Sequence, residues 1–551
     1  MAQAGARPAP TGRAGAPADT TRPDTGSRLV IIHHSDFLEQ ITRDSVQIEK
    51  LIGHDTLSQG RTRLYADSMY FNQKENVVEA FGNVHINDND SVDIYSRYLK
   101  YYATPKKALL RRQVKLTDGK DVLTTDSLDY DLPTHVGTYT KGGKVVNGTT
   151  ILTSDDGIYY GETKDVTFMK HVHLTDTAYK ITNDTLYYNT QTKIANWKVP
   201  TIIDDGKSII ETRRGFYDLK RNLFNSEDRP RIRDSSGSII ADRLAYDRNT
   251  GNGEARGNVV YKDTSSNTLL ANHVFFNRPR RNVLATEKPV LIILEGKDTT
   301  YVRADTFYSA LVRDLRYFRR HMNALGDTTL FPPGADSSSH PPSRDTVSHV
   351  AETEPTDSLP VKDSTLRYII GFHHVRVFSD SLQAKSDSLF YSDVDSVFQF
   401  FGKPAVWANH SQITGDTMYL YTKRQKPSRL YAFFNGFIIN SVGHDFFNQI
   451  TGRTINGYFK DGEMDYMRAK GYAHSVYFAQ NDSGAYLGLN TAEADAIDLF
   501  FVNRELNKVV FRNGVKGTTT PMRQIQIENT RLPNFKWQEA LRPKSKEELF
   551  Q

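Results

Sequence analysis

The feature that most constrains this chain is a short sequence phrase that returns about every thirty residues. Its clearest form is Tyr65-Ala-Asp-Ser-Met-Tyr-Phe71, in which an Asp marker is followed two positions later by an aliphatic residue and four positions later by an aromatic one. Copies of one unit bury their apolar residues against neighbouring copies, so the pattern predicts a solenoid rather than several unrelated domains. The markers are Asp67, Arg97, Asp126, Asp156, Asp184, Arg214, Asp242, Asn272, Asp305, Asp387, Asp416, Arg453 and Asp495.

The residues that follow each marker predict one apolar strand face. Side chains alternate along a β-strand, so the marker and the residues two and four positions after it are expected to share a face. The residue two positions on is apolar in every copy: Met69, Leu99, Leu128, Ile158, Leu186, Phe216, Leu244, Val274, Phe307, Leu389, Met418, Ile455 and Ile497. The residue four positions on is mostly aromatic: Phe71, Tyr101, Tyr130, Tyr160, Tyr188, Tyr246, Phe276 and Tyr391.

Each unit contains a second, bent strand. In the clearest copies a glycine follows the marker by fifteen residues, as Gly82, Gly257 and Gly402. A glycine inside a strand pattern indicates a bulge or a bend. The marker Asp is expected at the entrance of its strand, where its carboxylate accepts backbone N–H groups. The predicted fold is therefore all-β: an elongated two-sheet repeat, of the β-jellyroll or β-taco solenoid kind, built from two-strand units.

The repeat also sets the domain boundaries. Residues 29–310 form a first repeat block, 311–365 a short basic helix and a disordered Pro- and Ser-rich linker, and 366–520 a second block. Residues 521–551 are expected to form a surface tail, with Phe535 and Trp537 packing on the last strand.

The N-terminal residues 1–28 are predicted to be a disordered tail. They lack an apolar segment and do not form a signal peptide as they stand, although Ala2-Gln3-Ala4 resembles the end of a cleavage site. Two interpretations stay open: a hydrophobic leader is missing from this sequence, or the tail is simply disordered.

Composition and motifs argue against several functions. The chain has no cysteine, which excludes disulfides, thiolate zinc sites and cysteine nucleophiles, and its net charge of +5 does not favour nucleic acid. Gly206-Lys-Ser208 imitates the end of a phosphate-binding loop without its first glycine. The histidine pairs at 33–34, 171–173 and 373–374 have no recurring carboxylate partner. A calcium-binding ladder of marker Asp residues is also disfavoured, because each unit supplies only one. We expect no catalytic residue, metal or cofactor, and no enzymatic activity.

The repeat unit resembles the OstA/LptA family, whose members carry lipopolysaccharide between the two membranes of Gram-negative bacteria. The resemblance rests on Ala66-Asp67-Ser-Met-Tyr-Phe71 with Phe81-Gly-Asn-Val84, and on Ala241-Asp242-Arg-Leu-Ala-Tyr246 with Arg256-Gly-Asn-Val259. It covers residues 45–310 and, more loosely, 366–520. The chain is most similar to the large OstA-like proteins of the Bacteroidetes type. The resemblance implies a β-jellyroll with an apolar groove for acyl chains, end-to-end assembly with related jellyroll proteins, and a place in the periplasm or cell envelope.

The function expected from this resemblance is a periplasmic bridge that moves lipopolysaccharide or a related lipid toward an outer-membrane translocon. Strand edges at Leu29–Ile32 and Lys508–Phe511 are expected to pair with related jellyrolls. The residues expected to line the groove are Met69, Phe71, Leu99, Tyr101, Leu128, Tyr130, Ile158, Tyr160, Leu186, Tyr188, Leu244 and Tyr246. The same apolar residues could instead fill a closed core, so a structural or adhesive cell-surface solenoid without a ligand is the alternative. An enzyme of the parallel β-helix kind ranks third.

Overall fold

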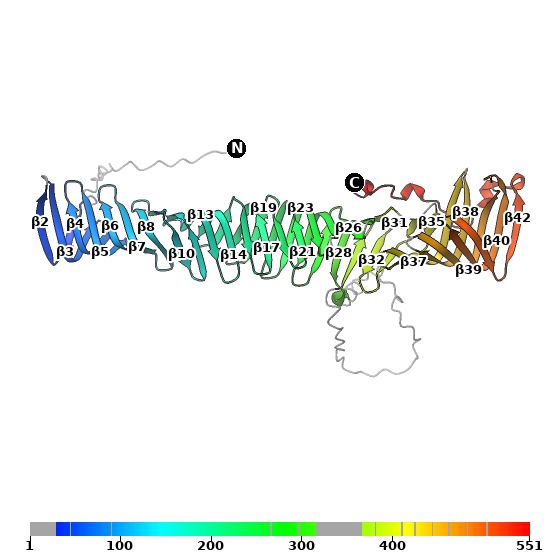
Figure 1. The fold of residues 1–551 in the computed structure, drawn as a ribbon, viewed down its shortest axis with the longest axis horizontal. Helices are drawn as coiled ribbons and strands as arrows, with labels where there is room; N and C mark the ends of the chain where they lie inside the picture. The colour runs from blue at the N-terminus through cyan, green and yellow to red at the C-terminus, as the bar shows by residue number, and fades with distance from the viewer. Residues whose placement is uncertain are drawn as a thin grey trace, which may run out of the picture. The chain divides into compact units, whose positions relative to one another are not determined.

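The computed structural model divides the chain into two compact units, Met1–Lys193 (unit 1) and Ile194–Gln551 (unit 2), which are described separately (Figure 1). The described residues are 29–43, 46–89, 91–264, 267–295, 298–315, 366–380, 382–408, 411–423, 426–443, 445–460, 463–481, 483–502 and 505–550. The expected N-terminal tail and residues 316–365 of the expected linker lie outside them. Within the described residues, no helix is long and apolar enough to cross a membrane.

Antiparallel strands make up almost all of the described part of unit 1. They are β1 (Ile31–His34), β2 (Phe37–Arg43), β3 (Val46–Gln59), β4 (Thr62–Asn72), β5 (Val77–Asp88), β6 (Val92–Tyr102), β7 (Lys107–Thr117), β8 (Asp121–Asp131), β9 (Val136–Tyr139), β10 (Gly143–Asn147), β11 (Thr150–Ser154), β12 (Asp156–Tyr160), β13 (Asp165–Thr175) and β14 (Lys180–Asn189).

Unit 2 continues with shorter strands and ends in long ones. They are β15 (Ile194–Trp197), β16 (Thr201–Asp204), β17 (Ser208–Thr212), β18 (Arg214–Asp218), β19 (Leu223–Glu227), β20 (Arg231–Asp234), β21 (Gly237–Ile240), β22 (Arg243–Asp247), β23 (Asn252–Asp263), β24 (Thr268–Asn277), β25 (Asn282–Thr286), β26 (Val290–Glu295), β27 (Asp298–Arg303), β28 (Thr306–Leu311), β29 (Arg367–Phe372), β30 (Val375–Phe378), β31 (Leu382–Ser386), β32 (Ser388–Ser392), β33 (Val397–Phe401), β34 (Ala405–Ala408), β35 (Ser411–Thr414), β36 (Thr417–Lys423), β37 (Lys426–Gly443), β38 (Phe446–Lys460), β39 (Glu463–Gln480), β40 (Tyr486–Val502), β41 (Glu505–Arg512) and β42 (Lys516–Pro521).

The helical content of the described residues is limited to short 3₁₀ turns in unit 2. They are η2 (Val312–Asp314), η4 (Met522–Gln524), η5 (Ile527–Thr530), η6 (Glu539–Leu541) and η7 (Lys546–Leu549). Only residues 311–315 of the expected basic helix are described: Leu311 ends β28 and Val312–Asp314 form η2, so the expectation for the rest of that segment stays a prediction. The predicted all-β class is confirmed.

The long strands are bent, and the bend creates two sheets. In β4, residues 62–65 pair with residues 85–88 of β5, whereas residues 68–72 pair with residues 77–81. We call the layer that contains residues 68–72 sheet 1 and the layer that contains residues 62–65 sheet 2. In each repeat the chain crosses from one sheet to the other on one side, which we call the corner. It returns through hairpins on the opposite side.

The corner explains both the marker residue and the glycine. Gly82 has φ +93°, and a Cβ atom there would collide with the carboxylate of Asp67. The same carboxylate accepts the backbone N–H of Asn83 at 3.0 Å. Asp67 therefore caps the bulge of the following strand. It lies in the middle of β4, not at its entrance, whereas Asp242 directly precedes β22 as predicted.

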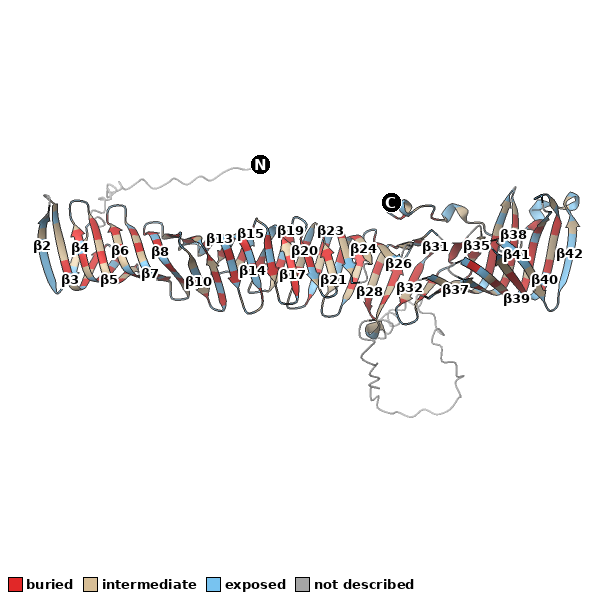
Figure 2. Ribbon diagram, in the orientation of Figure 1, coloured by how far each residue is buried: buried red, intermediate tan, exposed pale blue. Residues whose placement is uncertain are grey.

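Buried positions alternate with exposed ones along the strands (Figure 2). The side chains that fill the interior between the two sheets are mostly apolar. Eleven of the thirteen residues two positions after a marker are buried, from Met69 and Leu99 in unit 1 to Ile497 in unit 2. The marker itself does not share this face, because the corner inserts a residue into the alternation: Leu64 and Ala66 point inward before it, Met69 and Phe71 after it.

The two exceptions correct the predicted register. Ile158 is only half-buried, Tyr160 is 38% exposed and Phe216 is also 38% exposed, whereas Tyr159 and Tyr217 are buried. Two like residues stand side by side in each of these copies, Asp155-Asp156 and Arg213-Arg214, and the corner falls at the first of each pair. With Asp155 and Arg213 as markers, all steps from Asp126 to Asp242 become 29 residues. Ile158 and Tyr160 therefore do not line the interior.

In unit 2 the repeat continues from β28 to β29, because Thr306–Leu311 pairs with Arg367–Phe372. The C-terminal residues 522–550 run back over the sheet 2 strands of this unit, on the face opposite the interior (Figure 1). Phe535 and Trp537 pack on Phe447 of β38, with ring centroids 5.1 and 5.5 Å away. Their expected position on the last strand is therefore wrong.

The corrected register predicts opposite effects for two neighbouring tyrosines. Tyr159→Ala removes a buried ring and should lower the free energy of unfolding by about 3–5 kcal/mol. Tyr160→Ala removes an exposed ring and should change it by about 0.5 kcal/mol or less. Urea denaturation followed by circular dichroism measures both. A larger loss for Tyr160→Ala would restore the original register.

Candidate functional site

The strongest candidate site in unit 1 is the apolar interior itself. Met69, Phe71, Leu99, Tyr101, Leu128, Tyr130, Leu186 and Tyr188 are all buried there. Strand register links the aromatic positions into one row on sheet 1, in which Phe71 pairs with Val78, Val78 with Tyr101, Tyr101 with Ala108 and Ala108 with Tyr130. Leu244 and Tyr246 are also buried, but they line the interior of unit 2.

The opposite wall belongs to sheet 2 and was not predicted. Its row runs through buried residues that pair in sequence along the sheet: Leu64, Ile86, Ile94, Leu116, Leu123, Val145, Leu152, Leu174 and Ile181. Every second member lies three positions before a corrected marker, from Leu64 before Asp67 to Ile181 before Asp184. This spacing is the sequence signal that could have identified the second wall.

The hairpin side of unit 1 is closed by polar contacts between the two sheets, and we call this line of contacts the seam. Gln59 Nε2 donates to the carbonyl of Ala103 at 2.9 Å, and His135 Nδ1 lies 3.0 Å from Asp88 Oδ2. Two further contacts continue the line: Lys164 Nζ donates to Asp118 Oδ2 at 2.9 Å, and Asn147 Nδ2 donates to the carbonyl of Thr190 at 3.1 Å. The sheet 2 partners recur every 29 or 30 residues.

Interior tyrosines extend the seam inward. The hydroxyl of Tyr101 donates to Gln59, and the hydroxyl of Tyr130 lies 3.3 Å from Asp88. Burial raises the pKa of both tyrosines, so their hydroxyls remain neutral donors. Each ring therefore spans the interior from sheet 1 to the polar closure.

The two sides of unit 1 differ in strength. At the corner the covalent chain passes from one sheet to the other in each bent strand, whereas at the seam only side-chain contacts join the hairpins. A partly exposed ion pair contributes about 0–1 kcal/mol and a neutral hydrogen bond about 0.5–1.5 kcal/mol. The corner is therefore the covalently linked side of unit 1, and the seam is the weaker of the two.

The interior is filled in this structure. Beneath Asp118 and Lys164 a cavity of about 10 Å³ is lined by Leu116, Leu123 and Tyr159 among others. This is at the lower limit of the roughly 10–15 Å³ that a cavity needs to hold one water. A hydrocarbon chain could enter only if the seam opened and the wall residues moved.

Comparisons with known proteins identify one matching family and similar solved structures. The family described as OstA-like protein matches residues 27–184, which lie wholly in unit 1. Similar solved structures include the crystal structure of LptH from Pseudomonas aeruginosa, titled the LptA homologous periplasmic component of the lipopolysaccharide transport device, at 15% identity and a TM-score of 0.10. That match covers 31% of this chain and 84% of LptH. A comparison with curated proteins found no match.

The bent two-sheet repeat thus defines the class: this is a β-jellyroll repeat protein. More particularly, its residues 27–184 are an OstA-like segment, and the resemblance to the OstA/LptA family is confirmed there.

The Asp118–Lys164 contact predicts an acid-sensitive seam. Burial raises the pKa of Asp118, but hydrogen bonds from the backbone of Asp121 and from Lys164 outweigh it, so the pKa is lowered overall. The stability that the ionised Asp118 carboxylate supplies is fully present above the pKa of an unfolded Asp, near 3.9. It is lost as pH falls through the lower pKa of Asp118 in the folded protein. Asp118→Asn keeps an Oδ1 acceptor for the two backbone N–H groups, but it replaces the charged Oδ2 that accepts from Lys164 by an NH2 donor, so the contact with Lys164 is lost.

We expect Asp118→Asn to lower the free energy of unfolding by about 1 kcal/mol at pH 7, and to flatten its decline toward pH 3. Urea titrations across this pH range provide the measurement. Asp129→Asn is the control, because Asp129 pairs with Arg111 on the exposed surface. An equal effect of both substitutions would mean that the seam contact has no special role.

Proposed function

We propose that this chain is a non-enzymatic, periplasmic lipid-binding bridge. It carries lipopolysaccharide or a related lipid toward an outer-membrane translocon between the two sheets. The observation that carries the proposal is an apolar interior closed along one side only by side-chain contacts between hairpins. The OstA-like match over residues 27–184 supports the same class of function.

The energetics favour opening when a lipid is present. Each methylene transferred from water to an apolar interior contributes about 0.8 kcal/mol, so a chain of a dozen methylenes contributes roughly 10 kcal/mol. Each seam contact that must break contributes about 1 kcal/mol. Acyl chains would cover the two apolar walls that parting of the sheets exposes, so the cost of exposing them is offset.

One observation favours the alternative, a structural or adhesive solenoid with a permanently closed core. Many interior side chains, such as Leu128 and Leu186, have no accessible surface. A structural solenoid would keep this packing throughout its life. A lipid carrier would exchange it for acyl chains, and capture of lipid in cells distinguishes the two.

A photo-crosslinking amino acid at Tyr159 should capture lipid in cells that export the protein, because this side chain lies inside beneath the seam. The same amino acid at Tyr160 should capture little, because that side chain faces solvent. Mass spectrometry of the captured adducts identifies the lipid. Equal capture at both positions indicates membrane contact without specificity. No capture at Tyr159 in the exported protein favours the closed solenoid.

Assembly with related jellyrolls is part of the proposal. At the N-terminal end, β1 and β2 each pair only with β3 within the described residues. This edge exposes large apolar side chains: Phe37 is 73% exposed and Leu38 is 56% exposed. An open strand edge with exposed apolar residues is suited to strand addition. At the C-terminal end, the described contacts of β41 and β42 are likewise with β40.

Phe37→Glu should therefore reduce the amount of jellyroll partner that co-purifies from cross-linked envelopes, because a charge on an open edge opposes strand addition. Quantitative mass spectrometry measures the partner. Phe275→Glu is the matched control, since Phe275 is also exposed but lies on β24, far along the chain from either end. Unchanged recovery with Phe37→Glu would exclude docking through this edge.

A further inference from the structure

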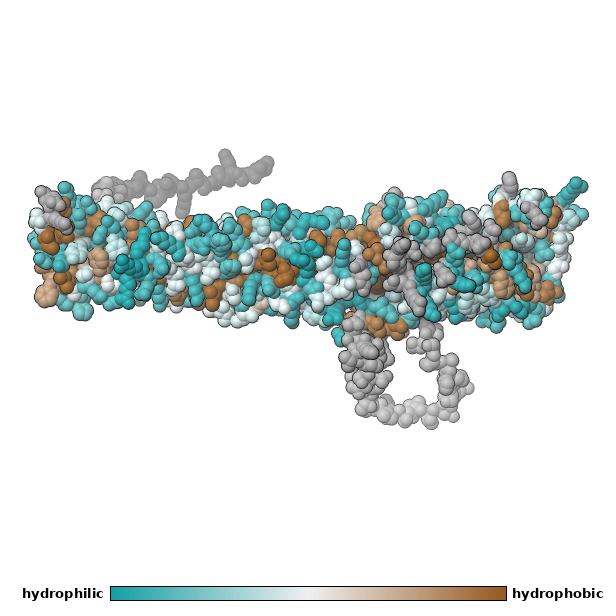
Figure 3. Space-filling view, viewed as in Figure 1, coloured by the Kyte–Doolittle hydropathy of each residue, from teal (hydrophilic) through white to brown (hydrophobic). Residues whose placement is uncertain are grey.

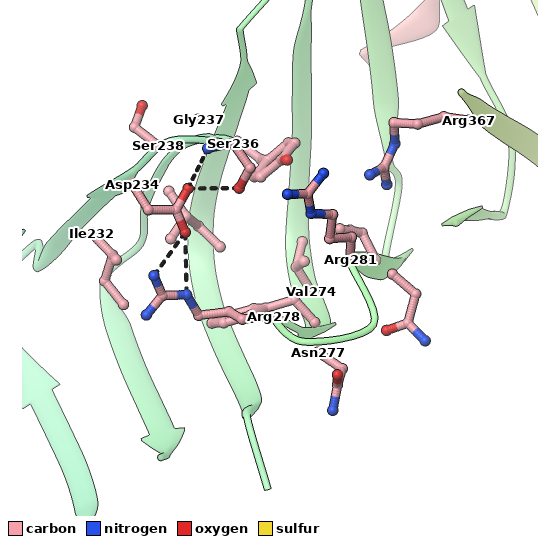
Figure 4. A pocket seen from close by; sticks show the side chains of 15 residues that line it. Ile232, Asp234, Ser236, Gly237, Ser238, Val274, Asn277, Arg278, Arg281 and Arg367 are labelled. Atoms are coloured by element: carbon pink, nitrogen blue, oxygen red, sulfur yellow. Dashed lines mark hydrogen bonds and ion pairs between the residues drawn. The ribbon is translucent and has the colours of Figure 1, made fainter. Parts of the chain in front are cut away.

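Unit 2 contains a cavity that opens on its hairpin side (Figure 4). It has a volume of about 60 Å³ and lies between the turn after Asp234 and the turn that contains Arg278 and Arg281. Apolar interior side chains, including Val274 and Phe276 of β24, form part of its wall. The cavity therefore connects solvent with the apolar interior of this unit.

The position of Arg281 in the repeat gives it a specific role. It is the last residue of its sheet 1 hairpin, with φ +52°, and it corresponds to His135 (φ +52°) and Lys164 (φ +61°) of unit 1. Those two side chains cross the seam to Asp88 and Asp118. At two of the equivalent hairpin positions, the side chain therefore reaches a carboxylate on sheet 2.

At Arg281 that carboxylate is already engaged. Asp234 accepts hydrogen bonds from Arg278 Nη2 at 2.9 Å and from Arg278 Nε at 3.2 Å, and Arg278 also lies 3.6 Å from Asp205 (Figure 4). Within the described part of the chain, the side chain of Arg281 makes no ion pair or hydrogen bond. A cation thus stands at the mouth of an apolar cavity without a counter-charge of its own.

Arg367 lines the same cavity from β29. Its guanidinium donates to Ser309 Oγ at 3.0 and 3.2 Å, and its backbone N–H donates to Asp393 at 2.9 Å. A guanidinium has five N–H donors, so that of Arg367 keeps donors for a further acceptor, with the Asp393 carboxylate as a nearby counter-charge. Two arginines thus line one cavity, and a phosphate accepts paired hydrogen bonds from arginine.

We propose that this cavity binds an anionic amphiphile, with its phosphate headgroup held by Arg281 and Arg367 and its hydrocarbon chain beside Val274 and Phe276. The proposal rests on the proposed lipid-carrying function and adds the class of headgroup and the place at which unit 2 holds it. A guanidinium pair at the rim and an apolar wall below it match the two ends of such a molecule.

The test uses the purified full chain and lysophosphatidic acid with a photoactivatable acyl chain. We expect the acyl chain to label β24, and Arg281→Gln to weaken binding about tenfold, as loss of a charge-assisted hydrogen bond does. Arg280→Gln is the matched control, because Arg280 is the exposed neighbour outside the cavity lining and should leave binding unchanged. Arg281→Lys should restore part of the affinity.

Three results would overturn the proposal. A monoacylglycerol of the same chain length that binds equally well would show that the headgroup charge is irrelevant. An equal loss with Arg280→Gln would indicate diffuse charge attraction. Inorganic phosphate that binds through Arg281 while the acyl chain leaves β24 unlabelled would indicate a free-phosphate site. If any of these results is found while Tyr159 still captures lipid, only the headgroup site in unit 2 is excluded. If Tyr159 captures no lipid, the proposed lipid-carrying function itself is excluded.

Discussion

The rest of this fold depends on the bend that recurs at each corner. A straight strand with period-two alternation presents one apolar face to one side. An extra residue at the corner changes the parity of the alternation, so Leu64 before the bend and Met69 after it both point inward. The capping of the Gly82 bulge by Asp67 fixes the place at which this change occurs. Repetition of the bend every 29 or 30 residues stacks the two halves of each strand into two facing sheets.

The same bend produces the asymmetry on which the proposed function rests. Because the chain crosses between sheets at the corner, all hairpins gather on the opposite side. The described backbone-to-backbone hydrogen bonds there stay within one sheet, so each seam contact between the two sheets involves at least one side chain. The chemistry of the seam contacts varies. In one copy a glutamine side chain donates to a backbone carbonyl, and in others an aspartate contacts a histidine, a lysine or an arginine. A closure of this kind can open without unpairing any strand.

The repeat allowed the fold and one wall of the interior to be predicted, because alternation is local information. The prediction failed where two like residues adjoin, at Asp155-Asp156 and Arg213-Arg214, since a shift of one residue reverses a whole strand face. The seam could not be predicted in the same way. Its partners are separated by 43 to 47 residues, and different residue types fill equivalent positions. Only the places of the seam residues within the repeat recur, and these can be recognised only when the structure shows which hairpins face each other.

The C-terminal segment shows how far such long-range contacts reach. Gln412 donates to the carbonyl of Lys536 and accepts the N–H of Gln538, and Gln449 makes the same pair of bonds with Thr530 and Leu532. Each buried amide thus satisfies an irregular backbone that has no neighbouring strand. The segment shields Phe447 and its neighbours on the face opposite the interior. It therefore completes the packing of unit 2 from outside, and a lipid held between the sheets would not have to displace it.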